Sequence, residues 1–323
     1  MSLALLSFPE QKDFLLSELK NRFGISQKPD SIFGDLLYYE NLELKALPYW
    51  ARTVMIEPFF LEYQSISDAA NSLKAIQRNW APYQFTLFRK TELIQNKLPY
   101  INLKERSFPC KIPTSDMGLY TLIDEKHLLA SAKTSSFLPA GTLRFKEDHQ
   151  NPPSRAYLKI QEALVMANLL QGSQFPEENS SSFEAGACPG GWTWVLTNLG
   201  SKVFAVDRSE LDPKLMKNPL VKFMSHDAFT LKPSDVIEAT GKIDWVFSDV
   251  ICYPERLLQW INLWLDYKED MKMICTIKMQ GEIDWKLISE FEAIKGSKIV
   301  HLNYNKHELT YLHTSNSSIK TTS

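Results

Sequence analysis

The chain has 323 residues, about twice the length of a usual domain, so its length predicts two domains. Its 36 basic and 38 acidic residues give a net charge of −2, and 44% of its residues are hydrophobic. This composition excludes a disordered or collagen-like chain, and every apolar run is far shorter than the roughly 20 residues that a membrane span needs.

Residues 1–150 are predicted to form a small α+β domain. Runs 3–8 and 36–39 are predicted strands that flank a helix over 10–23. A strand over 53–63, a helix over 67–79 and a hairpin of 119–124 with 127–131 follow. The polar segment 145–154 ends close to two prolines and is predicted to be a linker, which puts the domain boundary near residue 150. Ser154 is the expected N-cap of a helix over 155–171, and Gly172 is expected to close that helix.

A basic segment lies inside this first domain. Residues 74–111 contain eight basic and two acidic residues, whereas residues 1–73 contain six basic and ten acidic ones. Aromatic residues are interspersed with the basic ones. Because phosphates attract Lys and Arg and unstacked bases lie on aromatic rings, the segment is a candidate RNA-docking surface. The alternative is a solvated basic face whose aromatic residues belong to a core.

Residues 151–315 are predicted to form an α/β domain with a doubly wound, mostly parallel sheet. Short apolar runs alternate with helical segments, which is typical of a parallel sheet covered on both faces. The expected strands are 182–185, 202–206, 221–224, 243–248 and 271–277, and the expected helices are 192–199, 254–267 and 284–295. Runs 298–304 and 308–313 are expected to pair as an antiparallel terminal hairpin, and residues 316–323 to form a frayed tail.

A glycine-rich turn follows the first strand of this domain, in the sequence Phe-Glu-Ala-Gly-Ala-Cys-Pro-Gly-Gly-Trp-Thr-Trp over residues 183–194. Gly186, Gly190 and Gly191 are the positions where a ligand can approach the backbone, and the next helix offers free N–H groups. A dinucleotide-binding turn would read GxGxxG, which this turn does not, so a nicotinamide dehydrogenase is disfavoured. Acidic residues close the next three strands, Asp207, Asp227 and Asp249, and together they favour a nucleoside ligand over isolated helix caps.

The chain resembles the FtsJ-type ribose 2′-O-methyltransferases, which use S-adenosylmethionine, from Pro152 to about His313. The resemblance is carried by seven separated motifs in the family's order, at residues 153–163, 186–193, 205–208, 226–229, 248–250, 276–279 and 307–310. It implies a Rossmann-like methyltransferase fold and 23S rRNA as the substrate, with the first domain as a shortened THUMP-like RNA-docking module. It also implies cofactor-binding positions at Gly186, Cys188, Pro189, Gly190, Gly191, Trp192, Asp207, Asp227 and Asp249.

The same resemblance implies a catalytic tetrad of Lys159, Asp249, Lys278 and Glu308. A ribose hydroxyl is a poor nucleophile, so its attack on a methyl group needs alignment and removal of its proton. A lysine can remove that proton only where burial or another cation favours its neutral form. We expect Lys278 to be the general base, Lys159 its neighbouring cation, and the two carboxylates to orient the amines. Taken singly, each member has an ordinary reading as a surface charge.

The sequence departs from the family pattern at three places. Glu184-Ala185 stands for Asp-Leu before the turn, Ala156 replaces a small polar residue, and Met279-Gln280-Gly281 follows Lys278 in place of Leu-Pro. Two other functions therefore stay open: a methyltransferase with a non-ribose substrate, and a non-catalytic RNA-binding protein. The four cysteines form no CxxC pair, the six histidines complete no metal pattern, and the N-terminus lacks the basic region of a secretory signal. We expect a reduced, cytoplasmic protein without a metal and without a membrane contact.

Overall fold

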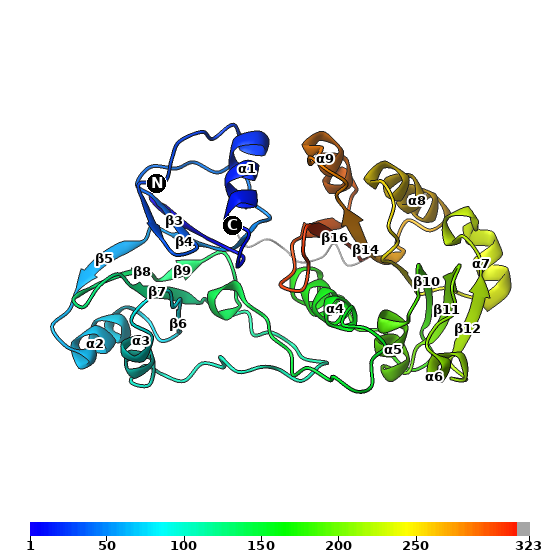
Figure 1. Ribbon diagram of the computed structural model, residues 1–323, viewed down its shortest axis with the longest axis horizontal. Helices are drawn as coiled ribbons and strands as arrows, with labels where there is room; N and C mark the ends of the chain where they lie inside the picture. The colour runs from blue at the N-terminus through cyan, green and yellow to red at the C-terminus, as the bar shows by residue number, and fades with distance from the viewer. Residues whose placement is uncertain (315–323) are drawn as a thin grey trace. The chain divides into compact units, whose positions relative to one another are not determined.

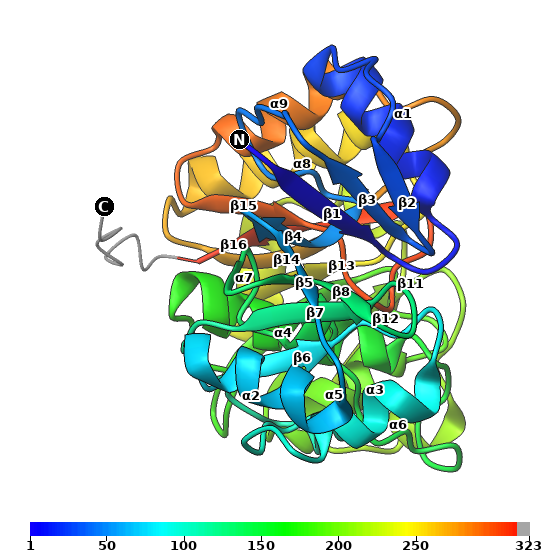
Figure 2. The same ribbon diagram turned by 90° about the vertical axis from the view of Figure 1, so that its left-hand side faces the viewer.

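The computed structural model of the protein describes residues 1–314, drawn in Figures 1 and 2. The expected tail over 316–323 lies outside these residues. The chain divides into two compact units, one of residues 1–106 and 112–144, the other of residues 107–111 together with the chain from Phe145 onward. The first is the N-terminal unit and the second is the C-terminal unit.

The N-terminal unit contains two sheets. The first is antiparallel, in the order β2 (Ser31–Phe33), β3 (Leu36–Tyr39), β1 (Leu3–Ser7), β4 (Ala51–Ile56), β9 (Lys133–Thr134). The second has the order β5 (Phe59–Glu62), β8 (His127–Ser131), β7 (Gly118–Leu122), β6 (Trp80–Pro82). Its helices are α1 (Lys12–Phe23), α2 (Ile66–Ile76) and α3 (Phe88–Gln95), with a 3₁₀ turn η1 (Pro139–Gly141).

Apolar side chains form two cores in this unit. One core joins α2 and α3 to the four-stranded sheet through residues such as Leu73, Trp80 and Tyr120. The other lies between the two sheets, where Leu6, Met55, Leu119 and Leu129 are buried. Each Å² of apolar surface that is buried in these cores stabilises the unit by about 25 cal/mol. The α+β expectation for this part of the chain is confirmed.

The C-terminal unit is built on one seven-stranded sheet. Its order is β12 (Val221–Ser225), β11 (Lys202–Asp207), β10 (Ser181–Ala185), β13 (Trp245–Ser248), β14 (Lys272–Lys278), β16 (Glu308–His313), β15 (Ser297–Val300). Pairing is parallel from β12 to β14, and β16 runs antiparallel to both of its neighbours. The predicted mostly parallel sheet with an antiparallel hairpin is therefore confirmed.

Helices cover both faces of this sheet (Figure 1). The helices α4 (Tyr157–Gln171) and α5 (Gly191–Asn198) contact each other on one face, and the short α6 (Pro213–Met216) packs on β12. On the other face α8 (Pro254–Tyr267) contacts both α7 (Pro233–Thr240) and α9 (Trp285–Ala293). A 3₁₀ turn, η2 (Ala228–Thr230), follows β12. No helix within residues 1–314 is long and apolar enough to cross a membrane.

Three expectations about local structure are wrong. The strand expected over 53–63 is two strands in different sheets, because Glu57 has a φ of 49° and Pro58 cannot donate to a ladder. The basic segment contains the helix α3, which we did not predict. Ser154 is not the cap of α4. The cap position is Ala156, and the amides of Leu158 and Lys159 donate to backbone carbonyls in the preceding turn.

Candidate active site

The glycine-rich turn lies at the point where the strand order of the large sheet reverses, between β10 and β13. Ligands of open α/β sheets bind at the carboxyl ends of the strands at such a point. Gly186 follows β10 with a φ of 76°, and a Cβ there would lie 2.6 Å from Cγ2 of Val250, in the segment after β13. Two requirements, a left-handed backbone and close approach of the next segment, thus select glycine at this position.

Gly190 and Gly191 allow the glycine-rich turn to pack closely against the neighbouring segments. Gly190 is the residue before α5, with a φ of 110°, and Gly191 is the first residue of the helix. A Cβ on Gly191 would lie 2.5 Å from Oγ of Ser154 and 3.2 Å from the backbone nitrogen of Tyr157. The start of α4 therefore packs directly against the start of α5, which leaves no room for a side chain between them.

The acidic residues after β11 and β12 hold the ends of their strands. Asp207 accepts hydrogen bonds from the amide of Cys188 at 3.1 Å and from the amide of Ser209 at 2.9 Å, so it fixes the glycine-rich turn. Asp227 accepts from the amide of Phe229 at 3.1 Å and lies 2.8 Å from a guanidinium nitrogen of Arg208. The cap and the arginines lower the pKa of Asp227 against the effect of its burial. Both carboxylates lie at the predicted edge of the sheet, and their role in binding a nucleoside stays a prediction.

Beneath the turn lies a buried carboxyl group, that of Glu184 in β10. Its Oε2 accepts a hydrogen bond from Oγ1 of Thr193 at 2.6 Å. Burial, helped by the nearby Asp249 and Asp207, raises the pKa of Glu184 to about 8, although the hydrogen bond from Thr193 lowers it. The side chain of Glu184, which is longer than that of the Asp in the family pattern, therefore reaches Thr193 in the first turn of α5. The raised pKa favours its neutral form there.

Two of the predicted cofactor residues face in different directions. The ring of Trp192 is buried and packs edge-to-face on Phe247, so it belongs to the core under the turn. Cys188 is exposed, and its thiol donates to the carbonyl of Glu210. Any contact that Trp192 makes with a ligand at this edge has to come from its backbone at the start of α5.

The four tetrad residues meet at one place. Nζ of Lys159 lies 3.3 Å from Oδ1 of Asp249 and forms an ion pair with Glu308. Nζ of Lys278 lies 3.2 Å from the same Oδ1 and donates to the carbonyl oxygen of Asp249 at 2.7 Å. The carboxylate of Asp249 thus contacts both amines. Their formal charges sum to zero, which allows four ionisable groups to share one partly buried cluster.

Each tetrad member is positioned by a different element. Lys159 is on α4, which is buried on nearly all sides, and only 9% of its side chain is exposed. Asp249 follows β13, Lys278 ends β14, and Glu308 begins β16. The antiparallel register of β14 and β16 sets Lys278 directly opposite Glu308. The reading of Lys159 as an exposed surface lysine is therefore wrong.

A second buried carboxylate supports the tetrad, and the sequence analysis missed it. Glu162 lies one helical turn after Lys159 on α4. It accepts from the amide of Asn303 at 2.9 Å, from Nδ2 of Asn303 at 2.7 Å and from the amide of Tyr304 at 3.1 Å. Asn305 in turn donates to the carbonyl of Glu308 at 3.0 Å. A glutamate three residues after a candidate lysine, in an otherwise apolar helix, was the signal available.

The segment after Asp249 presents two large apolar side chains beside the cluster. Ile251 is 78% exposed and Tyr253 is 65% exposed. Both precede α8, on the same stretch of chain that approaches Gly186. The edge that carries the tetrad is therefore bordered by an accessible ring and an accessible aliphatic side chain.

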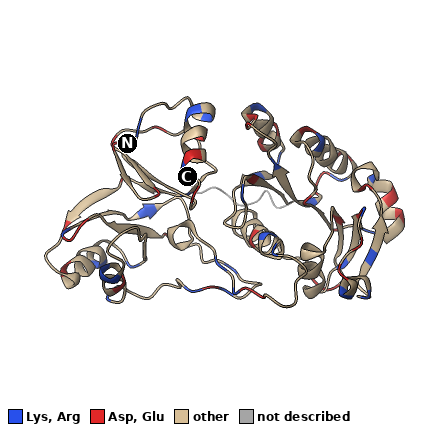
Figure 3. Cartoon of the chain, viewed as in Figure 1, with Lys and Arg blue, Asp and Glu red and all other residues tan. Residues whose placement is uncertain are grey.

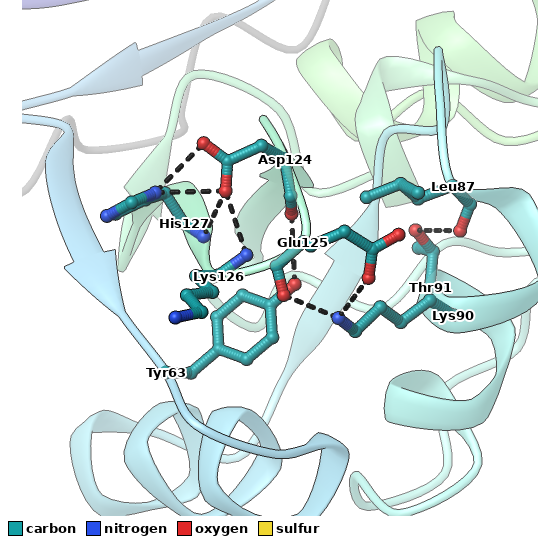
Figure 4. A network of polar contacts seen from close by, with 8 residues as sticks. All are labelled: Tyr63, Leu87, Lys90, Thr91, Asp124, Glu125, Lys126 and His127. Carbon is teal, nitrogen blue, oxygen red and sulfur yellow. Dashed lines mark hydrogen bonds and ion pairs between the residues drawn. The ribbon is translucent and has the colours of Figure 1, made fainter.

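The basic segment over 74–111 is not one surface. Trp80 is fully buried and Phe108 packs on Phe145 in the C-terminal unit, so part of the aromatic pattern belongs to cores. Lys90 is bound by Glu125, and the adjacent Asp124 binds His127 (Figure 4). Basic and acidic residues are interspersed over both units (Figure 3). Lys104 and Arg106, two basic residues of this segment, lie apart from this network and line a cavity in the N-terminal unit.

The chain is similar in sequence to known methyltransferases. Residues 152–295 match the model of the FtsJ-like methyltransferases. Ribosomal RNA large subunit methyltransferase M of Hahella chejuensis is 36% identical over 198 residues, which cover 57% of this chain and 49% of that protein. The same enzyme of Halorhodospira halophila is 32% identical over 142 residues, 44% of this chain and 39% of that one.

Residues 152–295 are therefore similar to the FtsJ-like methyltransferases. The chain spans about half or less of the length of the relatives compared here. The fibrillarin pre-rRNA processing protein of Methanococcus jannaschii aligns with a TM-score of 0.35 at 13% identity, over 66% of this chain and 87% of that one. That structural likeness is too low to add to the argument. The family resemblance inferred from the motifs is confirmed by the family model and the relatives.

Proposed function

We propose that the protein is an RNA ribose 2′-O-methyltransferase that uses S-adenosylmethionine and acts on 23S rRNA. The observation that carries the proposal is the assembly of Lys159, Asp249, Lys278 and Glu308 into one cluster beside the glycine-rich turn. Two amines and two carboxylates at the carboxyl edge of the sheet supply what transfer to a hydroxyl requires: a base and groups that hold it in place.

The residues at the strand ends fit a nucleoside cofactor. Gly186, Gly190 and Gly191 let the turn pack closely on its neighbouring segments at the edge of the sheet, and Asp207 and Asp227 present carboxylate oxygens at the ends of β11 and β12. When bound, S-adenosylmethionine supplies an electrophilic methyl group on a sulfonium. Asp249 links the two halves of the site, because its backbone amide donates to Ala185 before the turn while its carboxylate contacts both lysines.

The chain's own chemistry is proton removal and alignment. Lys278 accepts the proton of the ribose 2′-hydroxyl as the oxygen bonds to the methyl carbon and the carbon–sulfur bond breaks. Asp249 stabilises the ammonium that Lys278 then carries. Lys159 is fixed between Asp249 and Glu308, and we assign to it the orientation of the hydroxyl.

The choice of RNA rests on the relatives' names and on the edge of the site. Both relatives are named as ribosomal RNA large subunit methyltransferases. The exposed Tyr253 offers a ring on which a base next to the target ribose can stack. We propose that the N-terminal unit docks the RNA and delivers one ribose to the tetrad.

The test uses labelled S-adenosylmethionine and total RNA from a strain that lacks the protein, followed by mapping of the methylated ribose. We expect label at one ribose of 23S rRNA with the wild-type chain. Lys278→Met should abolish transfer and retain cofactor binding, whereas Lys286→Met, an exposed lysine on α9, should leave both unchanged. Label in protein, DNA or a base would refute the ribose assignment, and turnover by Lys278→Met would refute the base.

A further inference from the structure

A cavity in the N-terminal unit gathers four cationic side chains. Its volume is about 570 Å³, within the range of ligand sites, and all the residues that line it belong to this unit. The basic lining residues are Arg52, Lys104, Arg106 and Arg144, against a single carboxylate, that of Asp35. The cavity is therefore far more cationic than the chain as a whole, whose net charge is −2.

None of these four cations is neutralised by a neighbouring carboxylate. Within residues 1–314, none takes part in an ion pair. Lys90 in the same unit pairs with Glu125, whereas Lys74, Arg78 and Lys97 form no ion pair in the described chain, so what distinguishes the four cations is that they share one cavity. Four unpaired cations that share one cavity repel each other, and an anion placed among them would remove that repulsion.

Arg52 is held in place before any ligand arrives. It lies on β4, and its guanidinium donates to Oγ1 of Thr142 at 2.8 Å and lies 5.6 Å from the ring centre of Tyr83. Its Nε is buried and has no hydrogen-bond partner in the described part of the chain. Burial lowers the pKa of this guanidinium and outweighs the opposite effect of Tyr83 and Asp35, while the neighbouring Arg144 lowers it further.

The walls of the cavity are also fixed. The amide of Arg106 donates to the carbonyl of Arg144 at 2.8 Å, which joins two segments that carry lining cations. Gly141 has a φ of 66°, and a Cβ there would lie 2.1 Å from the carbonyl oxygen of Arg52. On the apolar side, the half-buried ring of Phe85 lines the cavity and stacks on Tyr83 at 6.1 Å. A base can lie against Phe85 while a phosphate sits among the cations.

We infer that this cavity binds a phosphate and an adjoining base of single-stranded RNA. The inference rests on the proposed function, since it is the docking half of an RNA methyltransferase that would need such a site. It also revises the expected docking surface. Of the expected segment 74–111, the cavity includes the basic residues Lys104 and Arg106. It adds Arg52 and Arg144 from outside the segment and does not include Lys90, which Glu125 binds.

The test compares two triple variants with the same change of charge. Lys104→Gln/Arg106→Gln/Arg144→Gln removes three cations of the cavity. Lys74→Gln/Arg78→Gln/Lys97→Gln removes three exposed cations elsewhere in the unit, none of them in an ion pair of the described chain. Binding of a fluorescent single-stranded RNA 12-mer is followed by anisotropy from 50 to 300 mM salt. Arg52→Lys is a single substitution that keeps the positive charge but loses the planar fork of the guanidinium. Circular dichroism checks that each variant folds.

We expect the cavity variant to lose affinity by about tenfold or more, and the slope of log affinity against log salt to fall by roughly 0.7, the value for the loss of one phosphate contact. The control variant should change affinity less than about threefold. Equal losses in the two triples would overturn the inference. Equal binding of cytidine monophosphate and the 12-mer would also overturn it, because it would indicate a nucleotide site. Methyl transfer by the wild-type chain is measured in parallel. If the wild type methylates ribose but the cavity variant binds RNA as tightly as the wild type does, the cavity is refuted and the proposed function is not. If RNA binding depends on the cavity but the wild type methylates no ribose, the proposed function is refuted and the cavity is not.

Discussion

The buried acid under the glycine-rich turn predicts a pH-dependent stability. Replacing Glu184 with Gln keeps the shape of the side chain and an oxygen that can accept from Thr193, and removes the ionisable group. In the folded chain the pKa of Glu184 is raised from 4.5 to about 8. A group whose pKa is raised on folding stabilises the fold most below its unfolded pKa and loses that contribution as the pH rises to its folded pKa.

The magnitude follows from the two pKa values. Well between them, each pH unit is worth about 1.4 kcal/mol, and the wild type loses about 4 kcal/mol of unfolding free energy from pH 4.5 to 8 through this group. Glu184→Gln does not suffer this loss. From pH 5.5 to 8, the unfolding free energy of the variant should therefore rise by about 3 kcal/mol relative to the wild type.

Guanidinium unfolding at several pH values measures this difference. Tryptophan fluorescence reports mainly on the C-terminal unit, because six of the eight tryptophans lie at or beyond Trp192. Other titrating groups, such as Glu162, are present in both chains and cancel in the difference. Glu178→Gln, an exposed glutamate before β10, is the control and should show no trend. A difference between Glu184→Gln and wild type that stays constant over this range would refute the reasoning.

Three further predictions concern the site. Glu162→Ala leaves three donors of Asn303 and Tyr304 without their acceptor, so unfolding should become easier by about 1–3 kcal/mol in denaturant titrations, with a lower kcat. Gly186→Ala forces an alanine into a positive φ and against Val250. It should destabilise the chain by at least about 1 kcal/mol and weaken cofactor binding in calorimetry. An unchanged affinity for the cofactor would count against the role of the glycine-rich turn in cofactor binding. Asp249→Asn removes the carboxylate that contacts both amines, so single-turnover transfer should slow by about 100-fold or more while the fold is retained.

The C-terminal unit was the more predictable part of the chain. Its strands and helices alternate in a regular way, and the helix expected over 254–267 has those bounds in the structure. A fully apolar strand between two polar turns can be recognised without knowing its neighbours. In the N-terminal unit the decisive features are local. The positive φ of Glu57 and the following Pro58 divide one apolar run between two sheets, and composition does not reveal such a break.

The candidate site was predictable to the extent that its residues follow strands or sit in a motif. Lys159, Asp249, Lys278 and Glu308 were found this way, and the structure places them in contact. Glu162 was missed because a buried acid in a helix has the same sequence pattern as a solvated one. The cavity cations were missed as a set because Arg52 and Arg144 are 92 positions apart and meet only through the fold.

The sheet order has a consequence for how the site comes into being during synthesis. Glu308 is on β16, which lies between β14 and β15 although it is made after both. Until β16 emerges from the ribosome, the apolar strand β14 has an open side, and Lys159 lacks Glu308 as its second carboxylate partner. Insertion of β16 closes that side and completes the charge cluster in a single event. The nascent polypeptide therefore acquires a closed sheet and a complete set of reactive groups together, and no shorter nascent form carries the cluster.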